Sequence, residues 1–268
     1  MPGAAAETSW LAELAEWGPT CLVGVPTQMA ALGRHPLANR LTLKTMLLSG
    51  EVAEDRLVRE LEQNFPGCRV FRHYGLTEAG LGGAVECERR LWPHLRDDLW
   101  AEIIGPDGRP QPPGAPGEIT LTPLTRLAMP LIRYRTGDEG LILASPCPCG
   151  SQMNRLQIFG RLADRFTLPS GRSLRAGDFE APLADLPFIR GYDLKLHPHT
   201  ALTLSLLTTP GAPGETPRLA AEAIAAWLGP GAAGLTLAVI LGHQLEGSGK
   251  RRLERTAEPP EADFIASW

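Results

Sequence analysis

Short apolar segments alternate with helical patterns over the first 75 residues, and this alternation limits the folds open to the chain. The segments "TCLVGVP", "LKTMLLSGE" and "CRVFRHYG" are typical of buried strands, separated by a helix that Pro26 opens and a helix that stops at Pro66-Gly67. Such alternation indicates a parallel, doubly wound sheet, whose ligands bind beyond the carboxyl ends of the strands. The ends "LLSGE" and "RHYGLTE" therefore predict one crevice that contains Gly50, Glu51 and residues 74–78.

From about residue 84 the pattern becomes rich in strands. "LWAEIIGPDGRP", "GEITLTPL" and "MPLIRYRTGDEGLILA" predict strands joined by Pro/Gly turns. Further on we expect a hairpin around "PSGRS", a short helix near "DFEAPLADL" and a hairpin over "YDLKLHPHTALTLSLL". A helix with Thr216 as its N-cap and Pro217 at its first position should end at Gly229, before the strand "LTLAVIL" and a polar tail. A boundary near "FGRLADR" gives a large domain over 1–160 and a small α+β domain over 161–268.

Composition excludes several classes of protein. The net charge of -4 argues against a protein built mainly to bind nucleic acid. The chain contains no apolar run near the ~20 residues that cross a bilayer, and "MPGAAAETSWLAELAEWG" does not read as a signal peptide. Five cysteines in 268 residues do not make a secreted disulfide scaffold. We therefore expect a reduced, cytoplasmic protein with no nucleic-acid or membrane partner.

Four short motifs follow one another along the chain: "YGLTE" at 74–78, "RYRTGD" at 133–138, "FGR" at 159–161 and "GSGK" at 247–250. Each alone is weak, but together they resemble the acyl-adenylate-forming (AMP-binding) superfamily. The longer run "GEITLTPLTRLAMPLIRYRTGD" is similar to the phenylacetate–CoA ligase and coenzyme F390 synthetase-like branch. The resemblance covers about Leu11 to Arg255. It implies the C-terminal part of a doubly wound α/β and β-rich large domain, followed by a small, mobile α+β C-terminal domain.

The resemblance implies an activity. The family binds Mg-ATP, joins AMP to a carboxylic acid with loss of pyrophosphate, and usually passes the acyl group to coenzyme A. Glu78 matches the magnesium-binding glutamate of the family, and this agrees with the preference of a hard cation between phosphates for a carboxylate. Thr77 matches the hydroxyl that binds phosphate. Both are expected to be catalytic. In the same motif and strand ends, Tyr74 matches the residue against adenine, beside Gly75 and the expected pocket walls Gly50, Glu51, Arg72 and His73.

Further matches lie later in the chain. Asp138 matches the aspartate that accepts both ribose hydroxyls, which suits an ionised two-oxygen acceptor. Arg161 matches the hinge-side arginine, and Gly171 with Arg172 matches the loop that faces coenzyme A. Lys250 matches the mobile catalytic lysine, whose charge neutralises developing negative charge. It is one of only three lysines among 26 basic residues.

Each assignment has a structural alternative. Asp138 could be a turn aspartate, Arg161 a surface ion-pair residue, Glu51 the start of a helix and Lys250 an exposed tail residue. Arg133 and Arg135 alternate on a strand, and we interpret them as structural.

A second group comprises Cys87, His94, Cys147 and Cys149. Three thiolates and an imidazole form a closed tetrahedral zinc shell with no open position, which predicts a structural zinc ion. The ligase branch carries cysteine clusters at matching places. Free thiols at a loop tip and a redox pair are the alternatives. Outside this group, Cys21 and Cys68 are expected in the core, and His197 and His199 in solvent.

The sequence departs from the family pattern in places. The Ser/Thr/Gly-rich phosphate loop, which in the family precedes "PTCLVGVP", has no counterpart in the first ten residues. We therefore expect the chain to represent the C-terminal part of a ligase, to have little turnover alone, and to bind AMP or an acyl-adenylate more readily than ATP. The hinge segment also has Ala163 where relatives usually carry a charged residue.

Three functions remain open from the sequence. The first is an AMP-forming ligase that activates a carboxylic acid, such as the aryl acid phenylacetate, and transfers it to coenzyme A. The second adenylates but delivers to another acceptor, as F390 synthetases do with a deazaflavin cofactor. The third is a catalytically silent nucleotide-binding or zinc-stabilised module. Expected partners are the acid, ATP or AMP, Mg²⁺, Zn²⁺ and coenzyme A, with a homodimer as one allowed assembly.

Overall fold

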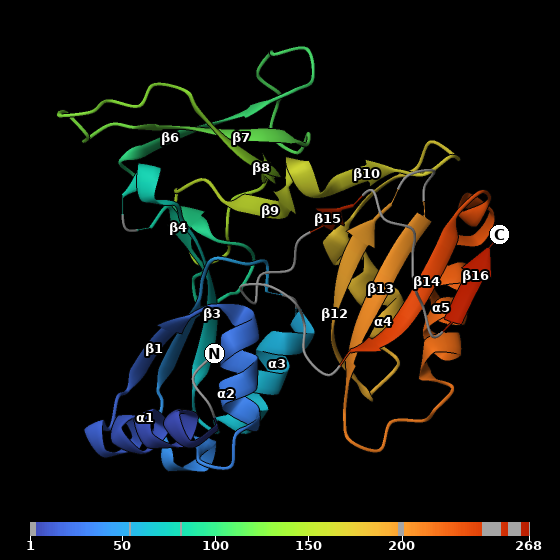
Figure 1. The fold of residues 1–268 in the computed structure, drawn as a ribbon. Helices are drawn as coiled ribbons and strands as arrows, with labels where there is room; N and C mark the ends of the chain where they lie inside the picture. The colour runs from blue at the N-terminus through green and yellow to red at the C-terminus, as the bar shows by residue number, and fades with distance from the viewer. Residues whose placement is uncertain are drawn as a thin grey trace. The chain divides into compact units, whose positions relative to one another are not determined.

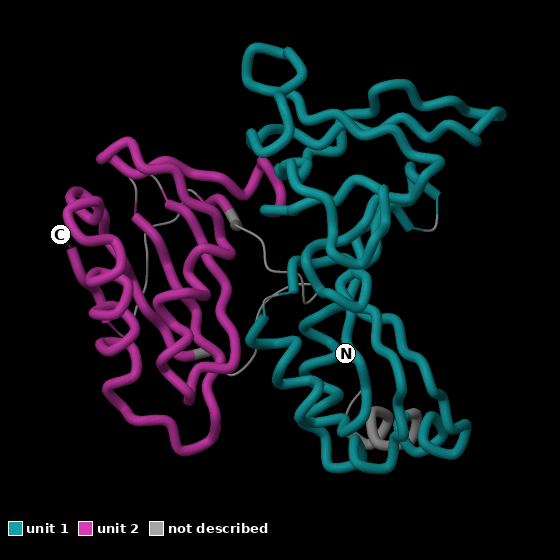
Figure 2. The backbone as a smooth tube through the Cα atoms, turned by 180° about the vertical axis from the view of Figure 1, so that it is seen from behind, with its two compact units in different colours: residues 1–159 teal, residues 160–268 magenta. Residues whose placement is uncertain are grey.

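The computed structural model describes residues 4–53, 55–80, 82–197, 201–242, 253–256 and 264–267. The chain divides into two compact units, Met1–Phe159 (unit 1) and Gly160–Trp268 (unit 2), drawn in teal and magenta in Figure 2. The chain passes from one unit to the other within β9 (Leu156–Arg161).

Unit 1 begins with a parallel sheet (Figure 1). After α1 (Ala4–Trp17), strands β1 (Cys21–Gly24), β2 (Thr45–Leu48) and β3 (Arg69–Tyr74) alternate with helices α2 (Pro26–Arg34) and α3 (Asp55–Asn64). The short helix η1 spans Ala38–Arg40. The strands pair in parallel in the order β1-β2-β3, so the predicted parallel α/β arrangement is confirmed.

The apolar spacing of α3 explains how this layer packs. Val58 and Leu61 lie three residues apart on one helix face, and both are buried against Met46 of β2 and Val70 of β3. The helix ends at Asn64, just before Pro66-Gly67, because proline disfavours a helical conformation in the residue before it. The core of the layer therefore sits between the helices and the strands that lead to the motif segments.

The sheet then changes direction. β3 pairs antiparallel with β4 (Ala84–Val85), which pairs antiparallel with β5 (His94–Leu95). A second sheet follows in the order β6-β7-β8-β9, with β6 at Leu99–Ile104, β7 at Gly117–Pro123 and β8 at Tyr134–Ile142. The predicted β-rich continuation is confirmed. A second short helix, η2 (Thr77–Ala79), lies in the segment between β3 and β4.

Unit 2 is a small α+β body. The hairpin β10 (Arg165–Thr167) with β11 (Ser173–Arg175) precedes a sheet in the order β15-β12-β13-β14-β16. Its core includes Phe179 and Ile224, which are fully buried. The remaining elements of unit 2 are β12 (Ile189–Leu196), β13 (Ala201–Thr208), β14 (Thr236–Gly242), β15 (Leu253–Arg255), β16 (Phe264–Ser267), α4 (Glu180–Leu183), α5 (Thr216–Leu228), η3 (Leu162–Asp164), η4 (Ala176–Phe179) and η6 (Gly229–Ala232).

Several details of the sequence analysis are wrong. The N-cap of α5 is Glu215, and Thr216 is its first helical residue, buried with its hydroxyl donating to the carbonyl of Pro213. The tail, expected to be only polar, contains β15 and β16. Sequence alone could not assign these strands, because both complete a sheet whose other members lie far away in the chain.

Two side chains also differ from expectation. Cys21 is exposed, because its side chain is on the solvent side of a strand with alternating exposure, whereas Cys68 is buried as predicted. His197 is buried, and its Nε2 lies 2.7 Å from the hydroxyl of Thr203, so it is not the solvated histidine expected. His199 lies outside the described residues. No helix in the described ranges has both the length and the apolar character of a membrane span.

Candidate functional site

The two longest motifs meet through a crossed tyrosine pair. Tyr74, at the end of β3, donates a hydrogen bond of 2.9 Å from its hydroxyl to Oδ2 of Asp138 in β8. Tyr134, at the start of β8, donates a hydrogen bond of 2.9 Å to Oε1 of Glu78 in η2. Each motif therefore binds the acidic residue of the other, and the two hydrogen bonds bring the segments of Glu78 and Asp138 together.

The backbone around Asp138 fixes this carboxylate. Asp138 is 8% exposed, and its backbone N–H donates to the Thr136 hydroxyl at 3.0 Å. That hydroxyl donates in turn to the carbonyl of Ile119 on β7 at 2.7 Å. Gly137 has φ +73°, a left-handed conformation that glycine adopts without steric cost. Asp138 lies within β8, where the pairing register with β7 shifts, so the predicted alternative of a turn aspartate does not describe its position.

The backbone of η2 is held by an arginine. Arg126, in the loop after β7, donates from Nη1 to the carbonyl of Thr77 at 3.2 Å and also to the carbonyl of Glu78. The Thr77 side chain is exposed and the Glu78 side chain is half-buried. Arg126 therefore supports the loop from its backbone side, with the hydroxyl of Thr77 accessible to a ligand.

The neighbouring strand end supplies the rest of the predicted crevice. The parallel register pairs Leu48 with Arg72, so the segment after β2 runs beside His73. The Ser49 hydroxyl and His73 Nδ1 lie 2.9 Å apart, and burial lowers the pKa of His73 below its ordinary value. Gly50, with φ +89°, follows on this side. The structure thus places Gly50 just after the end of β2 and His73 next to Tyr74 at the end of β3. Both lie at neighbouring strand ends.

Glu51 and Arg72 have other partners. Glu51 accepts hydrogen bonds from the backbone N–H and the hydroxyl of Thr27, at 3.3 and 3.2 Å, in the first turn of α2. A carboxylate there also interacts favourably with the helix dipole. Arg72 donates to the carbonyl of Ala53 at 2.6 Å and forms ion pairs with Asp55 and Glu86. Both side chains thus connect elements of unit 1.

The predicted residues of unit 2 are described separately. Arg161 ends β9 with an exposed side chain. Gly171 lies in the β10–β11 hairpin at φ +83°, and its N–H donates to the carbonyl of Leu168 at 2.9 Å. The Arg172 guanidinium lies 4.5 Å from the ring centroid of Trp227 in α5. Lys250 lies outside the described residues.

The structure also brings together Cys87, His94, Cys147 and Cys149. Their ligand atoms all lie within 4.8 Å of one another. The Sγ atoms of Cys87 and Cys147 are 3.7 Å apart, and Cys149 Sγ is 3.6 Å from His94 Nε2. Zn–S bonds of about 2.3 Å and Zn–N bonds of about 2.0 Å give tetrahedral edges of about 3.8 Å for S···S and about 3.6 Å for S···N. The donor set therefore fits a tetrahedral zinc ion.

A buried arginine joins the two loops that carry these side chains. Arg155, 5% exposed, donates to the carbonyl of Leu91 at 2.7 Å and to that of Ser145 at 2.6 Å. Its backbone also forms an antiparallel bridge with His94. The buried position of Arg155 could not be predicted from the sequence, because nothing in "MNRLQ" distinguishes a buried arginine from a solvated one.

Electrostatics differ among the thiols. The backbone N–H of Cys149 donates to Cys147 and is the largest cause that lowers the pKa of Cys147, to about 6. Burial is the largest cause that raises the pKa of Cys87. A thiolate is the metal-binding form, so Cys147 is prepared for ligation before any ion arrives. Nδ1 of His94 is buried and has no hydrogen-bond partner within the described part of the chain.

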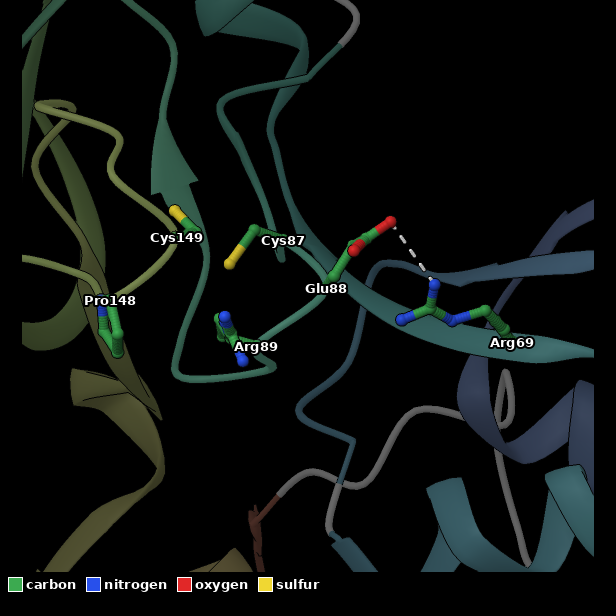
Figure 3. Close-up of a pocket in the computed structure, with 6 residues that line it drawn as sticks. All are labelled: Arg69, Cys87, Glu88, Arg89, Pro148 and Cys149. Carbon is green, nitrogen blue, oxygen red and sulfur yellow. Dashed lines mark hydrogen bonds and ion pairs between the residues drawn. The ribbon is translucent and has the colours of Figure 1, made fainter.

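A pocket of about 480 Å³ opens beside this cluster (Figure 3). Cys87 and Cys149 lie at its edge on different loops, and a 3.4 Å ion pair joins Glu88 to Arg69 across its far side. The pocket is lined by Arg69, Cys87, Glu88, Arg89, Pro148 and Cys149. The Cys/His cluster is therefore near the surface of unit 1.

Comparison with known proteins finds a family match over the first part of the chain. A family model described as "AMP-binding enzyme" matches residues 1–122. This part of the chain is similar to the AMP-binding superfamily. It is 33% identical over 152 residues to the phenylacetate-coenzyme A ligase of Thermus thermophilus, covering 55% of this chain and 34% of that protein. It is 34% identical over 131 residues to the Escherichia coli phenylacetate-coenzyme A ligase, covering 47% and 29%.

Solved structures confirm the fold class. A 2-hydroxyisobutyryl-CoA ligase in complex with an acyl-adenylate aligns with a TM-score of 0.79 at 20% identity, over 96% of this chain and 58% of that one. The anthranilate CoA ligase AuaEII with anthranoyl-AMP aligns with a TM-score of 0.71 at 16% identity, over 93% and 50%. The aligned region spans about a third of each of the two curated relatives.

A glycine in the first motif tests the geometry of the site. A Cβ on Gly75 would lie 2.8 Å from His73 Cε1 and 2.9 Å from the Cα of Gly82. The neighbouring backbone cannot move cheaply, so Gly75→Ala should lower the free energy of unfolding by about 1–3 kcal/mol. Gly214→Ala, where nothing lies within 4 Å, is the matched control. Denaturant unfolding of both variants measures this; equal stability would contradict the close packing of the motif.

Proposed function

We propose that this chain carries the nucleotide- and acyl-adenylate-binding part of an AMP-forming acid–CoA ligase. In the proposed reaction a carboxylate oxygen of the acid attacks the α-phosphorus of ATP, and pyrophosphate leaves. The thiol of coenzyme A then displaces AMP from the acyl-adenylate. The observation that supports this most is the crossed tyrosine pair, because it joins the carboxylates of Glu78 and Asp138 that such a site requires.

The proposed roles follow from the chemistry of each side chain. Asp138 accepts the two ribose hydroxyls, and the ring of Tyr74 lies against the adenine. The exposed hydroxyl of Thr77 donates to a phosphate oxygen. Glu78 would hold Mg²⁺, which when bound neutralises phosphate charge as pyrophosphate departs.

Residues of unit 2 complete the proposal. Arg161 and Lys250 provide positive charge toward the nucleotide, and Lys250 is proposed as the catalytic lysine of adenylation. A compact ammonium fits between a carboxylate and a phosphate oxygen better than a planar guanidinium does. The hairpin with Gly171 and Arg172 is proposed to face coenzyme A in the second step.

The substrate is proposed to be an aryl acid such as phenylacetate. The support comes from the relatives, since four of them are named phenylacetate-coenzyme A ligases and two are named feruloyl-CoA synthases. ATP–pyrophosphate exchange with a panel of aryl and alkyl acids tests this proposal. Exchange that depends on an aryl acid is expected from the full-length protein; exchange with alkyl acids alone would contradict the substrate class.

A different acceptor is the second candidate. An amide bond synthetase from Marinactinospora thermotolerans has the same fold, with a TM-score of 0.69 at 18% identity, so the fold also serves transfer to an acceptor other than coenzyme A. Product analysis with and without coenzyme A separates the two candidates. A thioester supports the ligase, and an acylated product of another class supports the alternative.

Zinc is proposed in a structural role. Cys87, His94, Cys147 and Cys149 would fill all four positions of a tetrahedral ion, which leaves no position for a reacting group. The ion would join the loop between β4 and β5 to the loop between β8 and β9. Stabilisation of unit 1 is therefore the proposed effect of the metal.

Replacing the ribose acceptor should weaken nucleotide binding. Asp138→Asn removes the ionised acceptor, and hydrogen bonds to charged groups contribute about 1.5–3 kcal/mol. We expect AMP to bind roughly 10- to 100-fold more weakly by calorimetry. Asp107→Asn, at an exposed turn between β6 and β7, is the control and should bind AMP like the parent. Unchanged affinity in Asp138→Asn would contradict the assignment.

Removing a zinc ligand should release the metal. The parent should contain about one zinc per chain, and Cys147→Ser should contain far less and unfold at a lower temperature. Cys21→Ser, at an exposed cysteine outside the cluster, is the control and should retain the metal. Elemental analysis after purification without added metal measures this, and zinc-free parent protein would contradict the proposal.

A further inference from the structure

The crossed tyrosine pair has a regular pattern in the sequence. "YGLTE" and "YRTGD" both place a tyrosine four residues before an acid, Tyr74 before Glu78 and Tyr134 before Asp138. In space the partners are exchanged, since each tyrosine donates to the acid of the other segment at 2.9 Å. Together the two hydrogen bonds constrain both the distance between the two segments and their relative rotation.

From this exchange we infer that Tyr134 is a positioning residue for Glu78, and that the hydroxyl of Tyr74 likewise positions Asp138. The inference rests on the proposed function, because it assigns a purpose to the two carboxylates. In it, the pair sets the spacing between the acid that binds metal and the acid that binds ribose. Neither hydroxyl reacts.

The donor type suits this purpose. An ionised carboxylate offers about four acceptor sites on two oxygens, and a tyrosine hydroxyl uses only one of them. A phenol is neutral, so the tyrosine itself adds no positive charge to the carboxylate. Nearby arginines make other contacts: Arg135 donates to Glu118 at 2.7 Å, and Arg126 donates to the carbonyl of Thr77 at 3.2 Å.

The flanking contacts show why the tyrosines matter. On one side, Arg126 holds the backbone of η2 but not the carboxylate of Glu78. On the other, Thr136 holds the backbone N–H of Asp138. The backbone of each segment thus has its own anchor, and the tyrosine hydroxyls orient the acidic side chains.

The chain provides a matched control. Its third tyrosine, Tyr192, is buried in unit 2 and donates from its hydroxyl to the carbonyl of Ala176 at 2.9 Å. Tyr192→Phe removes a hydrogen-bonding tyrosine hydroxyl, like Tyr74→Phe and Tyr134→Phe, but outside the exchange. A general loss of stability should appear in all three variants, whereas loss of positioning should appear only in Tyr74→Phe and Tyr134→Phe.

The first measurement needs no ligand. Melting temperatures of the full chain are compared in double-mutant cycles. Tyr134→Phe and Glu78→Ala should act on one interaction, so the double variant should melt close to the worse single variant. Tyr134→Phe with Tyr192→Phe should show additive shifts. If Tyr134→Phe and Glu78→Ala are also additive, the exchange does not exist and the inference is overturned.

The second measurement separates the two acids. Tyr134→Phe should raise the Mg²⁺ concentration that half-saturates Mg-dependent ATP binding by about threefold to tenfold, and should leave Mg-free AMP affinity unchanged. Tyr74→Phe keeps the aromatic ring but should reduce the preference for AMP over 2′,3′-dideoxy-AMP by a similar factor. Tyr192→Phe should match the parent in both assays.

The outcomes distinguish this inference from the proposed function. Coupled melting together with the two selective binding effects supports the inference. If the parent binds nucleotide but the two selective binding effects are absent, the inference is overturned. This holds even if the melting temperatures show coupling. A parent that binds neither AMP nor ATP with Mg²⁺ rejects the proposed function, and with it the assigned purpose of the exchange.

Discussion

A buried ion pair between Arg72 and Glu86 is the contact on which the rest of unit 1 depends. The Glu86 side chain is fully buried, and its Oε1 accepts from Arg72 Nη1 at 2.9 Å. Its Oε2 accepts from the backbone N–H of Arg72 at 2.9 Å, while the Glu86 N–H donates to the carbonyl of Arg72 at 3.0 Å. Breaking such a pair from one side typically costs about 3–5 kcal/mol, because a buried charge is left uncompensated.

The position of this pair explains how two groups of candidate residues share one support. Tyr74 follows Arg72 by two residues and begins the "YGLTE" motif, and Cys87 directly follows Glu86 in the loop between β4 and β5. Arg72 also reaches Asp55 at the start of α3, so the same guanidinium connects the parallel layer. Farther along, Arg90 of the β4–β5 loop pairs with Glu62 of α3. The β4–β5 loop is thus fastened to the α/β layer on both sides of Cys87.

Whether a feature could be predicted from the sequence depends on how far apart in the chain its interacting residues lie. Periodicity and proline positions suffice for β1, β2, β3, α2 and α3, because each forms from neighbours in the chain. The grouping of Cys87, His94, Cys147 and Cys149 could be predicted from residue types, since thiols and imidazole have few other uses in such clusters. The partners of Tyr74 and Tyr134 could not, because these contacts span 64 and 56 residues. Nor could the buried state of Arg155 and His197, which tertiary packing alone decides.

We propose that the "YGLTE" and "RYRTGD" segments form one adenylate-binding site. A crystal structure of the chain with a non-hydrolysable acyl-sulfamoyl adenosine that carries a phenylacetyl group would test this proposal. We predict both ribose hydroxyls within about 2.6–3.2 Å of the Asp138 carboxylate, with the adenine against the ring of Tyr74. An analogue bound elsewhere in the chain, or one whose ribose has no contact with Asp138, would contradict it.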